Sequence, residues 1–127
     1  MTNREIAKIL FEMAAFYEME GAPFKPTAYE GAALGIEAFS QEVKMIYEKE
    51  GVEGLIKIPG VGKGIAEHIE HLLNKGDFKE YAHFKKKYPF DVLGLVKIEG
   101  LGPKMVKTLW EKLRVRNRED LEKAARK

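Results

Sequence analysis

Two glycine-rich turns of the sequence have residue types that suit phosphate binding. IPGVGKGIA contains Gly60 and Gly62, and IEGLGPKMV contains Gly100 and Gly102 at the same spacing. Glycine allows positive φ and lets a ligand approach the main chain closely, because it has no Cβ. A helix that begins after the second glycine has unpaired N–H groups at the positive end of its dipole, which attract a phosphate. The turns therefore predict two contacts with a nucleic-acid backbone.

The turns belong to a longer internal repeat. GLIKIPGVG at 54–62 aligns with GLVKIEGLG at 94–102. In each copy the spacing of apolar residues predicts a short helix, a tight hairpin and an amphipathic helix. Val61 or Leu101, between the glycines, is expected to point back between the two helices. The glycines could instead be plain connectors, but the recurrence of the turn with the same flanks disfavours that interpretation.

The positive charge of the chain lies in the half that contains the repeat. Residues 1–50 hold 5 Lys and Arg against 9 Asp and Glu, whereas residues 51–127 hold 17 against 11, so the net charges are −4 and +6. Lys63, Lys97 and Lys104 lie beside the turns. This distribution favours a polyanion partner, with nucleic acid first, although an ordinary lysine-rich surface is the alternative.

Helices are the elements that must position both turns. Thr2, Thr27 and Asn117 each precede an acidic residue by three positions, as a side-chain cap does at the start of a helix. The first apolar run has helical spacing and stops at Gly21. No segment shows the alternation of a strand. The predicted fold class is therefore all-α.

The next elements are predicted from proline, serine and glycine signals. GAPFKPT is expected to be a connector, because Pro23 and Pro26 interrupt a regular helix. A second helix is predicted over about 28–39. Ser40 is the predicted cap of a third helix, which ends by Gly51.

A boundary between two units is predicted near KKKYP, at 85–89. Asp77 is expected to begin a short helix that ends there. The predicted units are residues 1–84, with the first turn, and residues 85–127, with the second.

The composition restricts the class of protein. The chain has 127 residues, is 45% hydrophobic and contains no cysteine, which excludes a disulfide framework and a thiolate metal site. No apolar run approaches the roughly 18 residues of a membrane span, and the N-terminus does not have the pattern of a secretory signal. The expected location is the cytoplasm.

The repeated pattern resembles the helix-hairpin-helix motif, whose turn amides bind DNA phosphates without reading the bases. In that family the turn carbonyls often coordinate a monovalent cation, Na⁺ or K⁺. The resemblance implies two sets of carbonyl ligands, one in each turn: Ile56, Ile58 and Val61, and Val96, Ile98 and Leu101.

The whole chain is similar to the N-terminal region of X-family DNA polymerases, particularly the prokaryotic type and more distantly DNA polymerase beta. The segments NREIAKIL, APFKPTAYEGAA, IPGVGKGIAEHIEHLLNKG and IEGLGPKMVKTLW carry this resemblance in the same order. It implies that the first half binds the downstream 5′-phosphate of a gap and that the second hairpin holds the primer strand.

The candidate DNA-binding residues follow from this resemblance and from the turns. They are Lys25, Tyr29, Gly60, Val61, Gly62, Lys63, Gly64, Ile65, Gly100, Leu101, Gly102, Lys104 and Met105. The leading hypothesis is a non-enzymatic module that binds gapped or nicked DNA in base excision repair, as part of an X-family polymerase or beside one.

Two other functions remain open. Some family members remove a 5′-deoxyribose phosphate through a lysine Schiff base, but that position is His68 here and a second family lysine falls at Glu80, which leaves Lys63 or Lys25 as the amine. A helical protein-docking module is the third hypothesis, through the acidic first fifty residues. Polymerase chemistry needs paired carboxylates for metal ions, and the aspartates are not closely paired in sequence: Asp77, Asp91 and Asp120.

Several other residues allow more than one interpretation. His68 and His71 are expected on a solvated helix face, with a phosphate contact or zinc as alternatives. Lys85–Lys87 either follow the DNA backbone or only complement a helix dipole. Trp110 is expected in the core rather than in a base-stacking position. Tyr29 either packs against the first helix or faces DNA.

Overall fold

The computed structural model describes residues 1–98 and 101–125. Over these residues the chain forms helices joined by short turns and contains no strand, which confirms the all-α prediction. The helices are α1 (Asn3–Met19), α2 (Lys25–Ala38), α3 (Val43–Glu50), α4 (Val52–Ile56), α5 (Lys63–Lys75), α6 (Lys79–Lys87), α7 (Val92–Val96), α8 (Pro103–Leu113) and α9 (Arg118–Ala125).

The first helix begins where its capping residues predict. The Thr2 hydroxyl accepts a hydrogen bond from the Glu5 N–H at 3.1 Å, and the Glu5 carboxylate accepts one from the Thr2 N–H at 3.0 Å. Ile6, Leu10 and Met13 recur at helical spacing and are completely buried. This face of α1 forms much of the core.

The start of α2 corrects two predictions. The helix begins at Lys25, inside the segment expected to be a connector, and Pro26 lies in its first turn. Proline fits there because the first N–H groups of a helix have no intrahelical partner. Thr27 is therefore inside the helix and does not cap it, and the N-cap residue is Phe24.

The start of α3 depends on a residue far away in sequence. The predicted cap, Ser40, does not cap α3, whose N-cap residue is Glu42 without a side-chain hydrogen bond. The Asn3 side chain instead accepts a hydrogen bond from the Val43 N–H at 2.8 Å. By contrast, the predicted cap at Asn117 is confirmed, because its side chain accepts a hydrogen bond from the Asp120 N–H at 2.9 Å.

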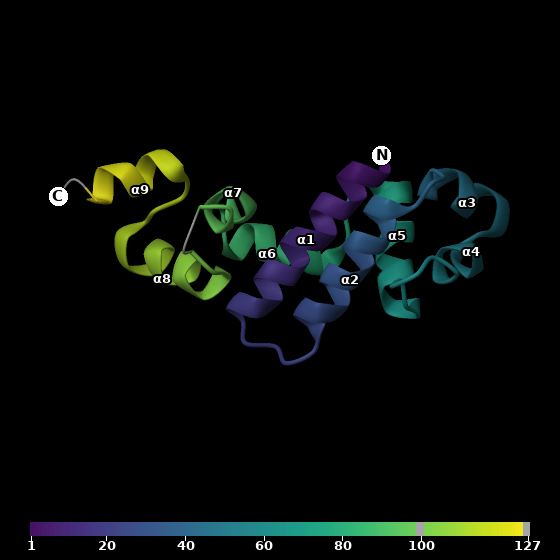
Figure 1. Ribbon diagram of the computed structural model, residues 1–127, viewed down its shortest axis with the longest axis horizontal. Coiled ribbons are helices and arrows are strands. Elements are labelled where there is room, and N and C mark those ends of the chain that lie inside the picture. Colours follow the sequence, from purple (N-terminus) through teal and green to yellow (C-terminus); the bar gives the residue numbers. More distant parts are fainter. Residues whose placement is uncertain (99–100, 126–127) are drawn as a thin grey trace.

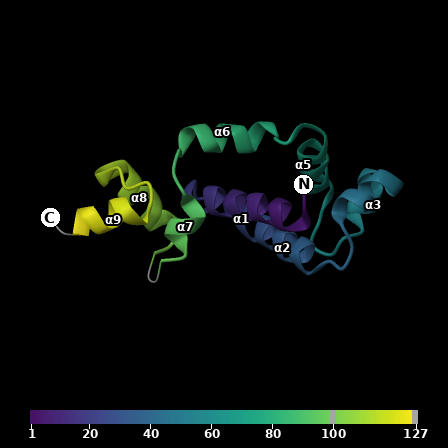
Figure 2. The same cartoon turned by 90° about the horizontal axis from the view of Figure 1, so that it is seen from above.

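The helices are arranged around the central pair α1 and α2, which lie side by side (Figure 1). The first hairpin, α4 and α5, lies at one end of this pair together with α3 (Figure 1). The second hairpin, α7 and α8, lies towards the other end with α9, and α6 leads across α1 from one hairpin to the other (Figure 2). The two hairpins are therefore separate places on the surface.

Buried apolar residues form one cluster that includes residues on both sides of the predicted boundary after residue 84. Phe84, Tyr88 and Phe90, for example, are all at most 6% exposed. The division into units 1–84 and 85–127 stays a prediction. Within the described residues, no helix is long and apolar enough to cross a membrane.

Candidate nucleic-acid interface

The two hairpins have the same backbone hydrogen bonds at matching positions. Both end their short helix with a tight turn and then begin a helix from a glycine N-cap. The matched N–H to O pairs are Ile58 to Leu55 (3.1 Å) with Ile98 to Leu95 (3.1 Å), Val61 to Ile58 (3.0 Å) with Leu101 to Ile98 (3.1 Å), and Ala66 to Gly62 (2.9 Å) with Val106 to Gly102 (3.0 Å). The internal repeat of the sequence is thus a repeat in structure.

The start of α5 presents open backbone donors. Gly62 is the N-cap residue, has no side chain to accept a hydrogen bond, and is followed by exposed Lys63 and Gly64. The first backbone N–H of α5 that donates a hydrogen bond within the helix is that of Ala66, to the Gly62 carbonyl. The N–H groups of Lys63, Gly64 and Ile65 are therefore available for an anion at the positive end of the helix.

The start of α8 has one backbone N–H donor fewer than the start of α5. Gly102 is again the N-cap residue, but the first helical residue is Pro103, which has no N–H. Lys104 and Met105 provide the remaining early N–H groups, and both side chains are exposed. Gly100, the other glycine predicted to bind DNA here, lies outside the described residues.

The middle residues of the turns point inward to different degrees. Val61 is 5% exposed, as expected for a side chain that points inward, whereas Leu101 is half-buried. Ile65, also a predicted contact, is 9% exposed. Its side chain packs in the core, so its main chain is the part near the helix start.

Gly60 makes a packing contact that the sequence pattern does not predict. Its φ is +90°, and a Cβ there would lie 2.6 Å from the Gly31 carbonyl oxygen. A Cβ on Gly35 would collide with the Pro59 carbonyl oxygen. The absence of a Cβ on Gly60 and on Gly35 therefore lets the first turn rest on the α2 backbone. A glycine inside a helix, such as Gly35, is the signal in the sequence for such a close approach.

Three other glycines at the two helix starts are open. A Cβ on Gly62, Gly64 or Gly102 would meet no atom within 4 Å. The absence of a side chain at these positions therefore leaves free space for a partner and is not needed for packing within the chain.

Tyr29 lies in the core beside α1. Its ring is 6% exposed and packs against Tyr17, with centroids 5.3 Å apart, and burial raises the pKa of its hydroxyl. Lys25 is exposed, and its Nζ lies 4.7 Å from the centroid of the Tyr17 ring. The neighbouring Phe24, which is not among the predicted DNA-binding residues, is 81% exposed.

His68 does not lie on a solvated face, so that prediction is wrong for His68, whereas His71 is exposed. The His68 ring stacks on Phe78 with centroids 4.3 Å apart, and its Nδ1 is 3.6 Å from a Glu80 oxygen. Burial lowers the pKa of His68, against the opposing effect of the Glu80 charge. Within the described residues no three acidic, histidine or cysteine side chains form a metal-binding group.

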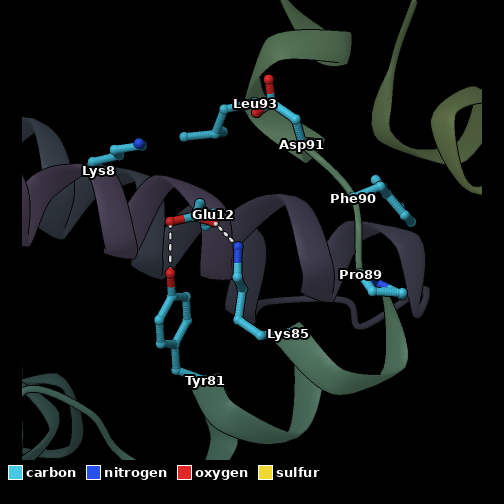
Figure 3. A pocket seen from close by; sticks show the side chains of 8 residues that line it. All are labelled: Lys8, Glu12, Tyr81, Lys85, Pro89, Phe90, Asp91 and Leu93. Atoms are coloured by element: carbon cyan, nitrogen blue, oxygen red, sulfur yellow. Dashed lines mark hydrogen bonds and ion pairs between the residues drawn. The ribbon is translucent and has the colours of Figure 1, made fainter. Parts of the chain in front are cut away.

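Two lysines of the 85–87 tract are paired with carboxylates of α1. Lys85 donates to Glu12 at 3.3 Å, and Lys87 donates to Glu20 at 2.9 Å. Figure 3 shows the Glu12 carboxylate between Lys85 and the Tyr81 hydroxyl, at the base of an open pocket of about 440 Å³. The tract therefore joins α6 to α1.

Trp110 is half-buried against Phe90, with ring centroids 5.5 Å apart, in agreement with its predicted place in the core. The Arg114 guanidinium lies 4.9 Å from the Trp110 ring centroid and covers it. The contact between Phe90 and Trp110 attaches α8 to the segment that precedes α7.

Comparison with known proteins agrees with this architecture. The family model described as a helix-hairpin-helix domain matches residues 1–78, which include the first hairpin. The chain is 28% identical over 125 residues to the DNA polymerase/3′-5′ exonuclease PolX of Bacillus subtilis (strain 168), covering 98% of this chain and 21% of that protein. It is 28% identical over 111 residues to DNA polymerase lambda of Arabidopsis thaliana, covering 87% of this chain and 20% of that protein. The chain thus spans about a fifth of the length of these relatives, and the resemblance to X-family polymerases is confirmed.

Proposed function

The chain belongs to the helix-hairpin-helix domain family, and from this we propose that it binds the sugar-phosphate backbone of gapped or nicked DNA without reading its sequence. The similarity to two DNA polymerases supports DNA binding in a polymerase-related context. We further propose that the chain acts in DNA repair, as part of an X-family polymerase or beside one, and that it works in the cytoplasm.

One observation carries this proposal: the hairpin hydrogen bonds occur twice, and each hairpin leads into a helix whose N-cap is an open glycine. Open backbone N–H groups are donors for phosphate oxygens and carry no information about base identity. Two such places on one chain suit two points on a DNA backbone.

Charge around the hairpins adds to the backbone contacts. Lys63, Lys97 and Lys104 are exposed close to the two turns. Each lysine that neutralises a phosphate releases a counterion, so the logarithm of the binding constant falls with the logarithm of salt by about 0.9 per contact. Affinity is expected to fall steeply as salt rises.

The start of α2 is the proposed binding place for the DNA end that borders a gap. Phe24 and Lys25 are both exposed and adjacent, and Lys63 is the exposed first residue of α5. An exposed aromatic ring beside a lysine suits an unstacked base together with its phosphate. These residues are the ones proposed to bind the 5′-phosphate at a gap.

We also propose that backbone oxygens of each turn bind a monovalent cation. The Ile58 carbonyl accepts one hydrogen bond from Val61, and the Ile98 carbonyl accepts one from Leu101. A carbonyl has two lone pairs, so each keeps one free for Na⁺ or K⁺. The proposed ligands are the carbonyl oxygens of two sets of residues: Ile56, Ile58 and Val61 in the first turn, and Val96, Ile98 and Leu101 in the second. The bound cation would supply positive charge near a phosphate.

Titration of a duplex with a one-nucleotide gap tests the function. The 5′-phosphate and 5′-hydroxyl forms of the gap, and an intact duplex, are compared at about 50 and 200 mM salt. Tightest binding to the phosphorylated gap, with a steep loss at high salt, is the expected result. Equal affinity for all three DNAs would reduce the function to general duplex binding, and no binding at low salt would reject it.

A glycine variant identifies the binding surface. Gly62→Val adds bulk at an open position, so it is expected to lower affinity about tenfold or more by blocking backbone approach. Lys85→Gln is the comparison, because Lys85 is already paired with Glu12, and it is expected to change affinity by less than about twofold. The opposite order would place the interface on α6.

Borohydride trapping on a 5′-deoxyribose-phosphate end tests the lyase alternative. The position of the family lysine holds His68, which is packed against Phe78, and an imidazole does not form a stable imine. No covalent adduct is therefore expected. A trapped adduct that disappears in Lys63→Gln or Lys25→Gln would show that the chain is an enzyme.

A further inference from the structure

The C-terminal end of α1 is where the second hairpin unit is attached to the first. The Glu20 carboxylate accepts hydrogen bonds from the Tyr88 hydroxyl and from Lys87 Nζ at 2.9 Å. One residue earlier, the Met19 carbonyl accepts a hydrogen bond from Lys107 Nζ of α8 at 3.3 Å. We call these five residues the Glu20 junction.

Aromatic packing continues from the Glu20 junction to α8. The Tyr88 ring is stacked near Phe16 of α1, with centroids 6.0 Å apart, and packs edge-on against Phe90 at 5.9 Å. Phe90 in turn packs against Trp110 of α8 at 5.5 Å. Since Glu20 fixes the Tyr88 hydroxyl, it also fixes the ring from which this contact with α8 begins.

The first hairpin is attached to the same helix pair in another way. Its turn rests on the α2 backbone at Gly31 and Gly35, and α2 packs along α1. The spacing between the hairpins therefore depends on the α1–α2 pair and on the contacts of α7 and α8 with α1, among which the Glu20 junction supplies polar contacts at the C-terminal end of α1.

We propose that Glu20 is a positioning residue, which holds the second hairpin at a set distance from the first so that both bind one DNA molecule. This inference rests on the proposed DNA binding and adds how the two sites act together. Two linked sites bind a long partner more tightly than either alone, by about 10²–10⁴ when the linkage has the right geometry.

The direction of the change in DNA affinity when Glu20 is replaced distinguishes a positioning role from simple charge repulsion. Removal of a carboxylate from a DNA-binding protein tightens binding when only its repulsion of phosphates matters. A positioning role predicts the opposite for Glu20. Glu18→Gln is the matched control. Glu18 is exposed near the same end of α1, and its substitution removes the same charge.

The experiment measures affinity for duplexes of increasing length, from about 8 to 30 base pairs, which is below one helical turn to three turns. The wild-type chain and Glu18→Gln are expected to gain affinity sharply once the DNA reaches both hairpins. Glu20→Gln and Glu20→Ala are expected to bind the shortest duplex normally and to lose about tenfold on the longest. Equal length dependence in all four proteins would overturn the inference, whereas no binding by any of them would reject the proposed function instead.

A distance measurement keeps the test independent of DNA affinity. The chain has no native cysteine, so Glu53→Cys on α4 and Lys112→Cys on α8, both exposed, accept one spin label each. The distribution of label distances is expected to be narrow in the otherwise native chain and broad with Glu20→Ala, while circular dichroism shows the same helix content. An unchanged distribution would contradict the positioning role.

Discussion

The two hairpins share their internal hydrogen bonds but are attached to the molecule in different ways. The turn of the first hairpin rests directly on the backbone of α2, because Gly60 and Gly35 have no Cβ. The second hairpin meets α1 through side chains, with Lys107 on the Met19 carbonyl. Backbone contact leaves no room for adjustment, whereas side chains can repack. The same motif is thus fixed rigidly at one end and adjustably at the other.

The hairpins also differ in what they offer to DNA. The first provides early N–H groups from Lys63, Gly64 and Ile65, while Pro103 removes one donor from the second. The first hairpin lies inside the matched helix-hairpin-helix region, residues 1–78. We expect the first hairpin to contribute more of the affinity.

The largest expected effect is on the attachment of the first hairpin. Gly60→Ala places a Cβ 2.6 Å from the Gly31 oxygen at a φ of +90°, so the free energy of unfolding should fall by about 2–5 kcal/mol. Gly64→Ala is the control, since nothing lies within 4 Å and alanine favours a helix by up to about 1 kcal/mol. Urea unfolding measures both, and equal stability of the two variants would show that the backbone contact with α2 is not tight.

The difference in donors gives the next effect, on DNA affinity. Lys63→Gln removes one charge and should reduce the salt slope by about 1. Lys63→Pro also removes the backbone N–H, so that the first hairpin, like the second, has a proline as its first helical residue. This variant should bind DNA about fivefold more weakly than Lys63→Gln. Pro103→Ala should tighten binding by a similar or smaller factor. Affinity titrations measure all three, and identical binding by Lys63→Gln and Lys63→Pro would mean that this N–H does not contact phosphate.

Acid should weaken the attachment of the second hairpin. The hydrogen bond from Tyr88, and then that from Lys87, lower the pKa of Glu20 below 4.5, its ordinary value. The contribution of Glu20 to stability is therefore full above that value and is lost as pH falls through the lower, folded-state pKa. Between about pH 5 and pH 3 the wild-type chain should lose more stability than Glu20→Gln. Parallel pH curves for the two proteins would mean that these hydrogen bonds contribute nothing.

The smallest expected effect concerns His68, on the second helix of the first hairpin, α5. Burial lowers the pKa of His68 from its ordinary 6.5, so the unfolded chain takes up a proton first as pH falls. Stability should therefore decrease as pH drops below about 6.5, until the folded-state pKa is reached. His68→Phe keeps the ring against Phe78 and should lose this part of the pH dependence. Denaturant unfolding at a few pH values measures it.

Local sequence patterns predicted much of the fold, and they were wrong at Thr27, Ser40 and His68. Thr2 and Asn117 cap their helices as predicted, because each cap needs only residues three positions away. Thr27 and Ser40 do not, because α2 starts before Thr27 and the N-terminal end of α3 is bound by Asn3. His68 was placed on a solvated face, since nothing in its neighbourhood in sequence shows that Phe78 will stack on it.

The sequence by itself determined the motif: the repeated Gly-x-Gly turns, their helical flanks and the open N–H groups follow from residues within one or two helical turns of each other. Only the tertiary structure decided what each residue of the motif does. It assigned Gly60 to packing on α2, left Gly62 open, and occupied Lys85 and Lys87 with carboxylates of α1. The physical reason is that close approach and ion pairing depend on segments far apart in sequence, which meet only when the core is formed.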